Sequence, residues 1–438
     1  MRILNFLILK LFIVVFILFL FSKTLNSQKI LSGPLQGHTT DTSAIFWLLT
    51  KKTSSICLIN PDSNSLINSF TINEDSVVSN CFKNKKAFKY TIFFSALNSA
   101  KINYSIRLND SQLEDYSVVK SSSNDSLFMF GSCAYIGKGF SKIYRPWNMT
   151  KIFRTMSTEN TKNMIWMGDN VYLIMNHDLK NNRRIYKRYI GVRKQRNMNK
   201  LLSSSVQHYS TWDDHDFGPN NTDGTYEKAS LTTAAFKNFW PNPETKNEKG
   251  IYYSFEKGDA SFFMTDGRTF KNNNDSILLG REQLTWLKKE LLSSVSTFKV
   301  IVLSNQLINC VEGHESYYDF KKEREELINF INSNKIPGIL FLSGDRHHSE
   351  INVESNQNYY PIYDITCSAL SSPRPKFRGW GPEGSLATRV ENSFITKHNY
   401  GLLLITNKSA KKKLVIRFVS KNGKTLFEHE IPMKVLGY

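Results

Sequence analysis

Acidic residues and a histidine are crowded into one short segment, 211-TWDDHDFGPNN-221, where Asp213, Asp214, His215 and Asp216 are consecutive. Each carboxylate raises the electrostatic cost of keeping its neighbours ionised. Such a cluster is tolerated either in a loop that faces bulk water or around bound cations. The other loops of the chain decide between these two interpretations.

Further apolar runs also end in residues that can bind metal ions or phosphate. These residues are Cys133, Asp169, Arg268, Asp345 and His347. Carboxylates, amide oxygens and imidazoles suit hard or borderline cations. Several carboxylates in one cleft repel one another unless bound ions neutralise them. The sequence therefore predicts a metal site, and we interpret the crowded aspartates as part of it.

The apolar runs indicate how these residues are positioned. After about residue 126, strand-like runs alternate with amphipathic helical patterns at 281–292 and 323–332. This layout is typical of an α/β domain whose site lies at the carboxyl ends of the strands. Before residue 120, short segments rich in β-branched and aromatic residues predict a small β-sandwich. The polar run 120–126 between the two parts is interpreted as a linker.

The order of the motifs GSC, GDN-VY, WDDHD with a following Asn, DGR and GD-x-H resembles that of the PhoD-like alkaline phosphatases. These enzymes are a branch of the calcineurin-like metallophosphatases. The resemblance implies a four-layer α/β/β/α metallophosphatase domain over residues 126–438, after a β-sandwich domain over 28–122. It also implies a binuclear or larger metal centre, expected to hold Fe³⁺ and Ca²⁺. Known relatives cleave phosphomonoesters and, in some cases, phosphodiesters.

The resemblance also assigns metal ligands. It implies that Asp169 bridges the ions and that the Cys133 thiolate binds iron. A ligating tyrosine is expected between the second and third motifs, where Tyr189 is preferred over Tyr186. The further ligands implied are Asn221, Asp345 and His347.

Three other residues are expected to act on the substrate. Arg268 is the candidate for binding the phosphate oxygens, with Asp266 fixing its orientation. His215 is expected to protonate the departing alkoxide or to hold the phosphate. Asp214 either binds a metal or positions His215. Bound metals would lower the pKa of water and so provide hydroxide near neutral pH.

We therefore expect an exported phosphoesterase that acts on a phosphate ester substrate. One alternative is a phosphodiesterase or phospholipase D-like enzyme acting on a lipid or a cell-wall polymer. Another is a non-enzymatic surface binding protein stabilised by calcium, but a calcium scaffold has no need of Cys133, His215 and Arg268.

The ends and composition of the chain bear on its location and partners. Residues 1–27 are interpreted as a signal peptide cleaved after Ser27, with an uncleaved anchor as the alternative. We expect a secreted, periplasmic or cell-surface monomer with no stable membrane partner unless the leader is retained. The net charge of +19 comes from scattered residues, so no specific nucleic-acid partner is expected. The odd number of cysteines leaves at least one unpaired, and a Cys57–Cys81 bridge stays open.

Overall fold

The structure is a computed structural model. It describes residues 29–51, 53, 55–60, 70–94, 101–108, 114–119, 126–136, 149–173, 179–311, 315–357, 359–373, 386–406 and 412–437. The expected signal peptide, 1–27, and residues 120–125 of the expected linker lie outside these residues. None of the helices within the described ranges has the length and apolar character needed to cross a membrane.

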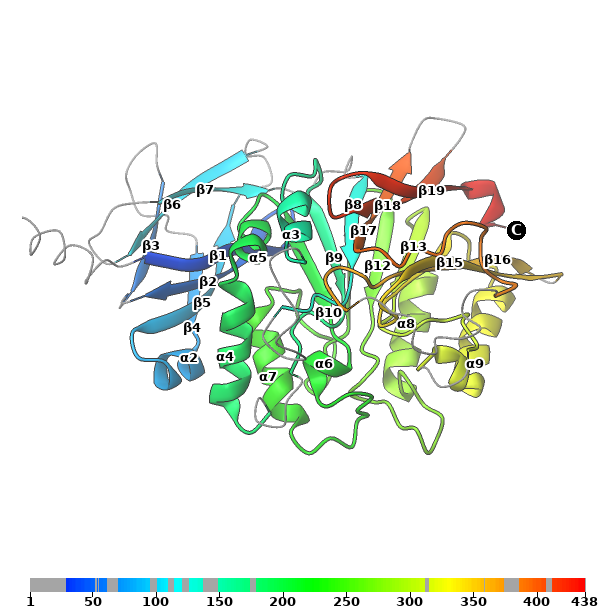
Figure 1. Cartoon of the computed structure of the whole chain (residues 1–438), viewed down its shortest axis with the longest axis horizontal. Coiled ribbons are helices and arrows are strands. Elements are labelled where there is room, and N and C mark those ends of the chain that lie inside the picture. Colours follow the sequence, from blue (N-terminus) through cyan, green and yellow to red (C-terminus); the bar gives the residue numbers. More distant parts are fainter. Residues whose placement is uncertain are drawn as a thin grey trace, which may run out of the picture.

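A ten-stranded mixed sheet runs through the molecule (Figure 1). Its strands, in spatial order, are β19 (Thr425–Pro432), β18 (Lys413–Ser420), β17 (Asn399–Thr406), β8 (Leu127–Gly131), β9 (Asn163–Met167), β10 (Gln207–Thr211), β1 (Lys29–Thr39), β2 (Ser43–Lys51), β5 (Lys85–Phe93) and β4 (Phe70–Glu74). The central strands β8, β9 and β10 are parallel to one another. Their carboxyl ends therefore lie at the same edge of the sheet.

The central strands are apolar on both faces because both faces are buried. Successive residues of a strand point to opposite faces. Accordingly, Phe130 and Ile165 belong to one core cluster, whereas Met129 and Trp166 belong to another. This explains why β8 and β9 are continuous apolar runs in the sequence.

The face of β8 and β9 that bears Phe130 and Ile165 shares its core with a six-stranded sheet. The strands of this sheet, in spatial order, are β11 (Tyr253–Lys257), β12 (Ala260–Met264), β13 (Phe298–Val302), β14 (Ile339–Ser343), β16 (Tyr359–Cys367) and β15 (Ser349–Asn356). Strands β11 and β12 form a hairpin around Gly258 and Asp259.

Two groups of helices contribute to different cores. Leucines and isoleucines of α8 (Arg281–Ser293) and α9 (Lys321–Ser333) pack with the six-stranded sheet, at the sites of both predicted helices. The other core, which contains Met129 and Trp166, is completed by α3 (Lys151–Met156), α4 (Asn182–Arg193), α5 (Arg196–Leu202) and α7 (Ala229–Phe239). Shorter helices are α2 (Ser76–Cys81), α6 (Asp214–Phe217), η2 (Tyr317–Asp319) and η4 (Met433–Val435).

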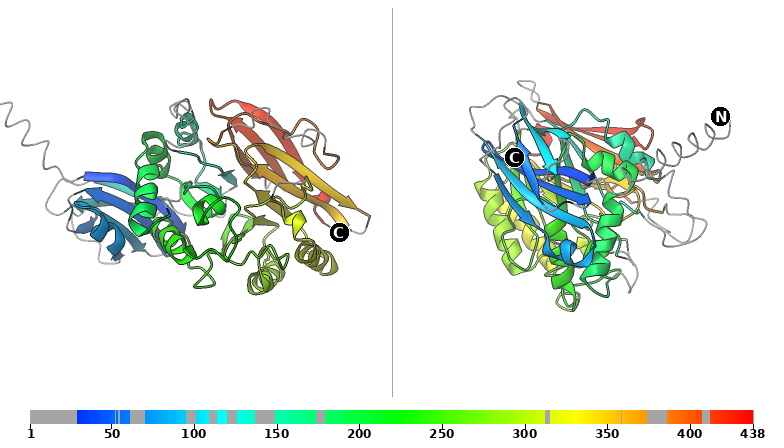
Figure 2. Two further views of the ribbon diagram at one scale, coloured as in Figure 1. Left: turned by 60° about the horizontal axis from the view of Figure 1, so that its bottom comes forward. Right: turned by 90° about the vertical axis from the view of Figure 1, so that its left-hand side faces the viewer.

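The amino-terminal region is rich in β-strands, as predicted, and lies at one end of the molecule (Figures 1 and 2). Its three-stranded sheet consists of β3 (Ile56–Ile59), β6 (Lys101–Leu108) and β7 (Glu114–Val119). This sheet shares a core of Phe46, Tyr90 and Tyr104 with β2 and β5. Strand β1 also pairs with β10 at Gln36 and Gln207, so strands from both parts of the sequence share the ten-stranded sheet.

The five cysteines are all free thiols. The Cys57–Cys81 bridge that the sequence left open is therefore absent. Cys57 lies on β3, in the three-stranded sheet, whereas Cys81 ends α2.

Candidate metal centre

Turns that follow four strands bring the predicted ligands together. Cys133 follows β8, Asp169 follows β9, and Asp214 with His215 begins α6 after β10. His347 follows β14, which belongs to the six-stranded sheet. The site is thus assembled from both sheets, as expected for residues at the carboxyl ends of strands.

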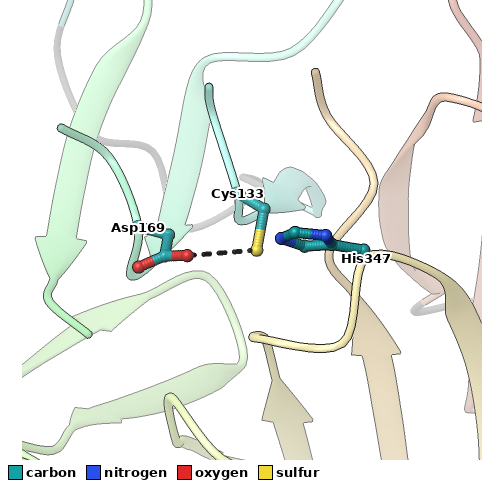
Figure 3. Close-up of side chains that lie close together, drawn as sticks. All are labelled: Cys133, Asp169 and His347. Carbon is teal, nitrogen blue, oxygen red and sulfur yellow. Dashed lines mark hydrogen bonds between the residues drawn. The ribbon is translucent and has the colours of Figure 1, made fainter. Parts of the chain in front are cut away.

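Two groups of three side chains have the geometry needed to hold a metal ion. The first is Cys133, Asp169 and His347, and the second is Asp169, Asp214 and His215. Within each group the potential ligand atoms lie within 4.8 Å of one another. Figure 3 shows the first group, in which the Cys133 thiol donates to Asp169 Oδ2 at 3.5 Å. Asp169 belongs to both groups, so its carboxylate is placed to serve two ions.

The backbone at these turns adopts a conformation that most residues avoid. Cys133 (φ 58°), Asp169 (φ 54°), Asp345 (φ 68°) and His347 (φ 57°) all have positive φ. Each such residue costs on the order of 1–3 kcal/mol and persists only where the surrounding structure holds it. The turns hold one another here, because the Ala134 amide donates to the Asp169 carbonyl at 2.9 Å. The strain is therefore concentrated where the ligand side chains converge.

The electrostatics of Asp169 fit a bound cation. Burial raises the pKa of Asp169 well above its usual range, and the negative charges of Asp214 and Asp213 raise it further. Its Oδ1 atom is buried and accepts no hydrogen bond from any described residue. Burial and the charge of Asp169 likewise raise the pKa of the Cys133 thiol. A cation among these donors would stabilise the ionised carboxylate and thiolate, which fits the expected metal centre.

Asp214 differs from Asp169 because it already has partners. Its carboxylate accepts the amides of His215 and Asn221, each at 2.7 Å. Burial acts to raise the pKa of Asp214, but His215, Arg268 and these two amides outweigh it and lower the pKa to about 2. Asp214 is therefore ionised across the whole neutral range.

Both histidines of the site are held neutral. Burial lowers the pKa of His215, and burial together with His215 lowers the pKa of His347 to about 4. Neutral imidazole is the form that binds metals. Asp345 lies outside both groups of three, but its charge contributes to the raised pKa values of Cys133 and Asp169.

The tyrosine beside the candidate ligands is Tyr172. Its hydroxyl lies 3.5 Å from His347 Nε2, and its ring stacks on that of His215 at 4.5 Å between centroids. Burial raises the pKa of this hydroxyl well above its usual range, and the charges of Asp169 and Cys133 raise it further. Tyr172 is therefore the phenol available to an ion held by Cys133 and Asp169.

The structure does not bring the expected tyrosine, Tyr189, to this place. Its ring packs on Phe239 at 4.7 Å, and the charged groups that affect its pKa are Asp216 and Arg193. The competing Tyr186 accepts a hydrogen bond from Asn238 at 2.7 Å. Both tyrosines belong to the buried face of α4, whereas Tyr172 stands three residues after Asp169 in the same turn. The signal that sequence reasoning missed was the VY that ends 168-GDNVY-172.

The orientation of Arg268 also differs from the expectation. Its Nε donates to Asp213 at 2.7 Å, and its Nη2 lies 2.8 Å from Glu315. Asp266 instead accepts the backbone amide of Arg268, so the prediction that Asp266 orients the guanidinium is wrong. The guanidinium is fully buried and its charge is shared between two carboxylates. Arg268 thus fixes the Asp213–Asp216 segment rather than presenting a free fork to a phosphate.

Asn221 touches the site through its backbone. Its amide donates to Asp214, whereas its side-chain Oδ1 accepts from Asn220 at 2.6 Å. Asp216, which the sequence placed with the metal-binding aspartates, lies outside both ligand groups, and its carboxylate accepts the amides of Asn170 (3.1 Å) and Val171 (2.8 Å). Asp216 therefore holds the turn that carries Asp169 and Tyr172.

Comparisons with known proteins indicate the family and the fold of the chain. The sequence profile of the family described as PhoD-like phosphatase matches residues 128–399. Alkaline phosphatase D of Bacillus subtilis (strain 168) is 26% identical over a match that covers 32% of this chain and 30% of that protein. The match thus spans less than a third of that relative's length.

Two solved structures have a similar fold. The structure of PhoD gives a TM-score of 0.65 at 15% identity and covers 91% of this chain and 88% of the other. Purple acid phosphatase PPD1 from yellow lupin (Lupinus luteus) seeds gives a TM-score of 0.66 at 12% identity and covers 91% and 74%.

Proposed function

The chain belongs to the PhoD-like phosphatase family, and on that basis we propose that it is an exported, metal-dependent phosphoesterase acting on phosphate monoesters. The observation that carries the proposal is the position of Asp169, which is shared by two groups of candidate ligands. One carboxylate between two ion positions is the arrangement expected of a binuclear hydrolase.

The donor sets suggest which ions would be held. The first set offers the Cys133 thiol, the His347 imidazole and the nearby Tyr172 phenol, which suit Fe³⁺. The second set, Asp169, Asp214 and His215, is richer in carboxylate, and its carboxylate oxygens suit a hard ion such as Ca²⁺. When bound, such a pair of ions supplies Lewis acidity and a hydroxide nucleophile near neutral pH.

The chain's own residues orient and hold these groups. Asp216 fixes the turn of Asp169 and Tyr172, and the Arg268–Asp213 pair fixes the start of α6 next to Asp214 and His215. A neutral His215 can bind an ion or accept a proton. It can donate a proton to a departing alkoxide only when it is protonated. Because burial lowers the pKa of His215, the protonated form is rarer at a given pH than for an exposed histidine.

Replacing Asp169 tests the proposal directly. In Asp169→Asn we expect the hydrolysis of a chromogenic phosphate monoester to fall by more than the roughly 10–100-fold typical of residues that only support a ligand. Elemental analysis should show fewer bound ions per chain. The matched control is Asp259→Asn, which removes a carboxylate paired with Lys412 at the half-buried β11–β12 turn, outside both ligand groups.

Wild-type turnover by a folded Asp169→Asn protein would contradict the proposal, as would full activity after chelation. Comparing the monoester with its bis-ester separates the remaining enzyme class. A higher turnover of the bis-ester would indicate a phosphodiesterase.

A further inference from the structure

A basic groove of about 560 Å³ lies along helix α4, outside the ligand groups of the metal centre. Its floor is formed by Phe82, Ile136 and Ile190. Lys85, Arg183, Lys187 and Lys194 surround this floor, and none of the described residues that line the groove is Asp or Glu. We refer to it below as the α4 groove.

The positive charge of the groove is part of a larger concentration. Residues 179–200 contain no acidic residue and nine basic ones, which are Lys180, Arg183, Arg184, Lys187, Arg188, Arg193, Lys194, Arg196 and Lys200. Basic residues are scattered over most of the chain, as expected, but at this helix they are concentrated.

Three of the groove cations lie in one row. Arg183, Lys187 and Lys194 are spaced by four and seven residues, which places them on one side of the helix over roughly 16 Å. The four cations of the groove form no ion pair with a described carboxylate. A ligand would therefore meet charges that the protein does not neutralise itself.

Gly191 lies within α4 and lines the groove. Glycine is unfavourable in a helix interior compared with alanine. Its φ is not positive, and a Cβ placed on it would meet nothing within 4 Å. Neither backbone conformation nor packing requires glycine here, but its lack of a side chain keeps the floor of the groove open.

We propose that the α4 groove docks the protein on an anionic lipid bilayer, with a phosphate headgroup held by the row of cations above the apolar floor. Clusters of four or more basic residues attract anionic membranes in this way. Phe82 supplies the one aromatic ring among the described residues that line the groove, and it is partly buried. The Lys85 ammonium lies 5.8 Å from the centroid of this ring. The groove therefore offers no stack of exposed rings for nucleic-acid bases.

The α4 groove lies close to the metal centre. Arg188, on the same helix, donates from Nε to the carbonyl of Tyr172 at 2.9 Å. Ile136 of the groove floor is three residues after Cys133.

The test compares the full chain with variants by co-sedimentation with vesicles. One set of vesicles contains phosphatidylglycerol and phosphatidylcholine in equal parts, and the other contains phosphatidylcholine alone. Every variant has the same leader, so on a given set of vesicles any insertion of the leader contributes equally to each variant. We expect Lys187→Glu/Lys194→Glu to weaken binding to the anionic vesicles at least tenfold at about 0.1 M salt.

Two further variants separate the groove from net charge. Lys289→Glu/Lys322→Glu makes the same change in net charge at exposed positions of α8 and α9, and should bind as the wild type does. Gly191→Trp keeps every charge but fills the groove, and should weaken binding severalfold, whereas Gly191→Ala should not. Thermal unfolding and hydrolysis of a soluble monoester verify that each variant is folded.

Three results would overturn the proposal. The first is unchanged binding by a folded Gly191→Trp protein, and the second is an equal loss in the α8/α9 control. The third is displacement from the vesicles by a single-stranded oligonucleotide at charge concentrations equal to those of the lipid, which would indicate a nucleic-acid surface instead. None of these results depends on phosphoesterase activity.

Discussion

Two buried arginines show how differently the metal centre and the junction with the amino-terminal strands are built. Arg268, at the metal centre, is fully buried and paired with Asp213 and Glu315. Arg193, at the end of α4, is 2% exposed and lies over the rings of Trp47 (4.5 Å) and Trp240 (4.6 Å).

The two environments shift the pKa values in opposite directions. Arg268 has its pKa raised by the two carboxylates despite burial, whereas burial lowers the pKa of Arg193 to about 9. Arg193 donates from Nη2 to the Phe239 carbonyl at 2.7 Å but pairs with no carboxylate among the described residues. The site thus uses charge pairing, which fixes geometry, and the junction uses aromatic packing, which fills space.

Removing each arginine should give the largest difference between the two regions. Arg268→Gln leaves the buried carboxylate of Asp213 without its cation, whereas the partly exposed Glu315 keeps Lys271. We therefore expect a loss of about 3–5 kcal/mol in the free energy of unfolding, caused by Asp213. Arg193→Met loses cation–π contacts worth about 2 kcal/mol when desolvated, but it also removes a costly buried charge. We therefore expect the smaller loss for Arg193→Met. Urea unfolding of both variants measures the difference.

The double variant Arg268→Gln/Asp213→Asn serves as the control for the pairing argument. It should recover part of the stability lost in Arg268→Gln, because one unpaired carboxylate is removed. The comparison fails if Arg193→Met costs as much as Arg268→Gln.

The two tyrosines give the next largest contrast. Tyr172→Phe removes the hydroxyl beside His347 and should lower monoester hydrolysis by about 10–100-fold, with a matching loss of metal affinity. Tyr189→Phe removes a hydroxyl that contacts no described ligand and should leave hydrolysis within about twofold of the wild type. If iron is bound, the visible absorption band of the protein should change in Tyr172→Phe alone. Loss of the band in Tyr189→Phe would restore the expectation from sequence.

A smaller effect concerns acid stability at the junction. His208 is fully buried, and its Nδ1 accepts from Trp166 at 3.0 Å. Burial and the nearby Arg193 lower the pKa of His208 to about 3. Below pH 6.5 the unfolded chain therefore binds a proton that the folded chain does not. The free energy of unfolding then decreases by about 1.4 kcal/mol for each unit that the pH drops, until the folded pKa is reached.

His208→Gln keeps an acceptor for Trp166 but removes this titration. Between pH 6.5 and 5 we expect the stability advantage of the wild type over the variant to shrink by about 2 kcal/mol. The site carboxylates titrate in both proteins, so they cancel from the difference. Parallel stability curves for the two proteins would show that His208 is not the titrating group.

Much of the fold could be predicted from the sequence, because buried strands and amphipathic helices leave periodic patterns of apolar residues. The apolar runs ending at Cys133 and Asp169 became β8 and β9, and the helix predicted over 281–292 became α8. The pairing of β1 with β10 was not readable, because it joins Gln36 and Gln207 across a long sequence separation. The partner of Arg268 was missed for the same reason, since Glu315 is far from it in the chain.

The sequence by itself determined the kinds of ligand and their positions after strands, because strand periodicity and turn chemistry are local properties. It could not determine which tyrosine reaches the thiol, which carboxylate holds Arg268, or that basic residues gather along one groove of α4. Those outcomes depend on how two sheets and their turns approach one another in space, and tertiary packing alone sets the distances between side chains that are remote in sequence.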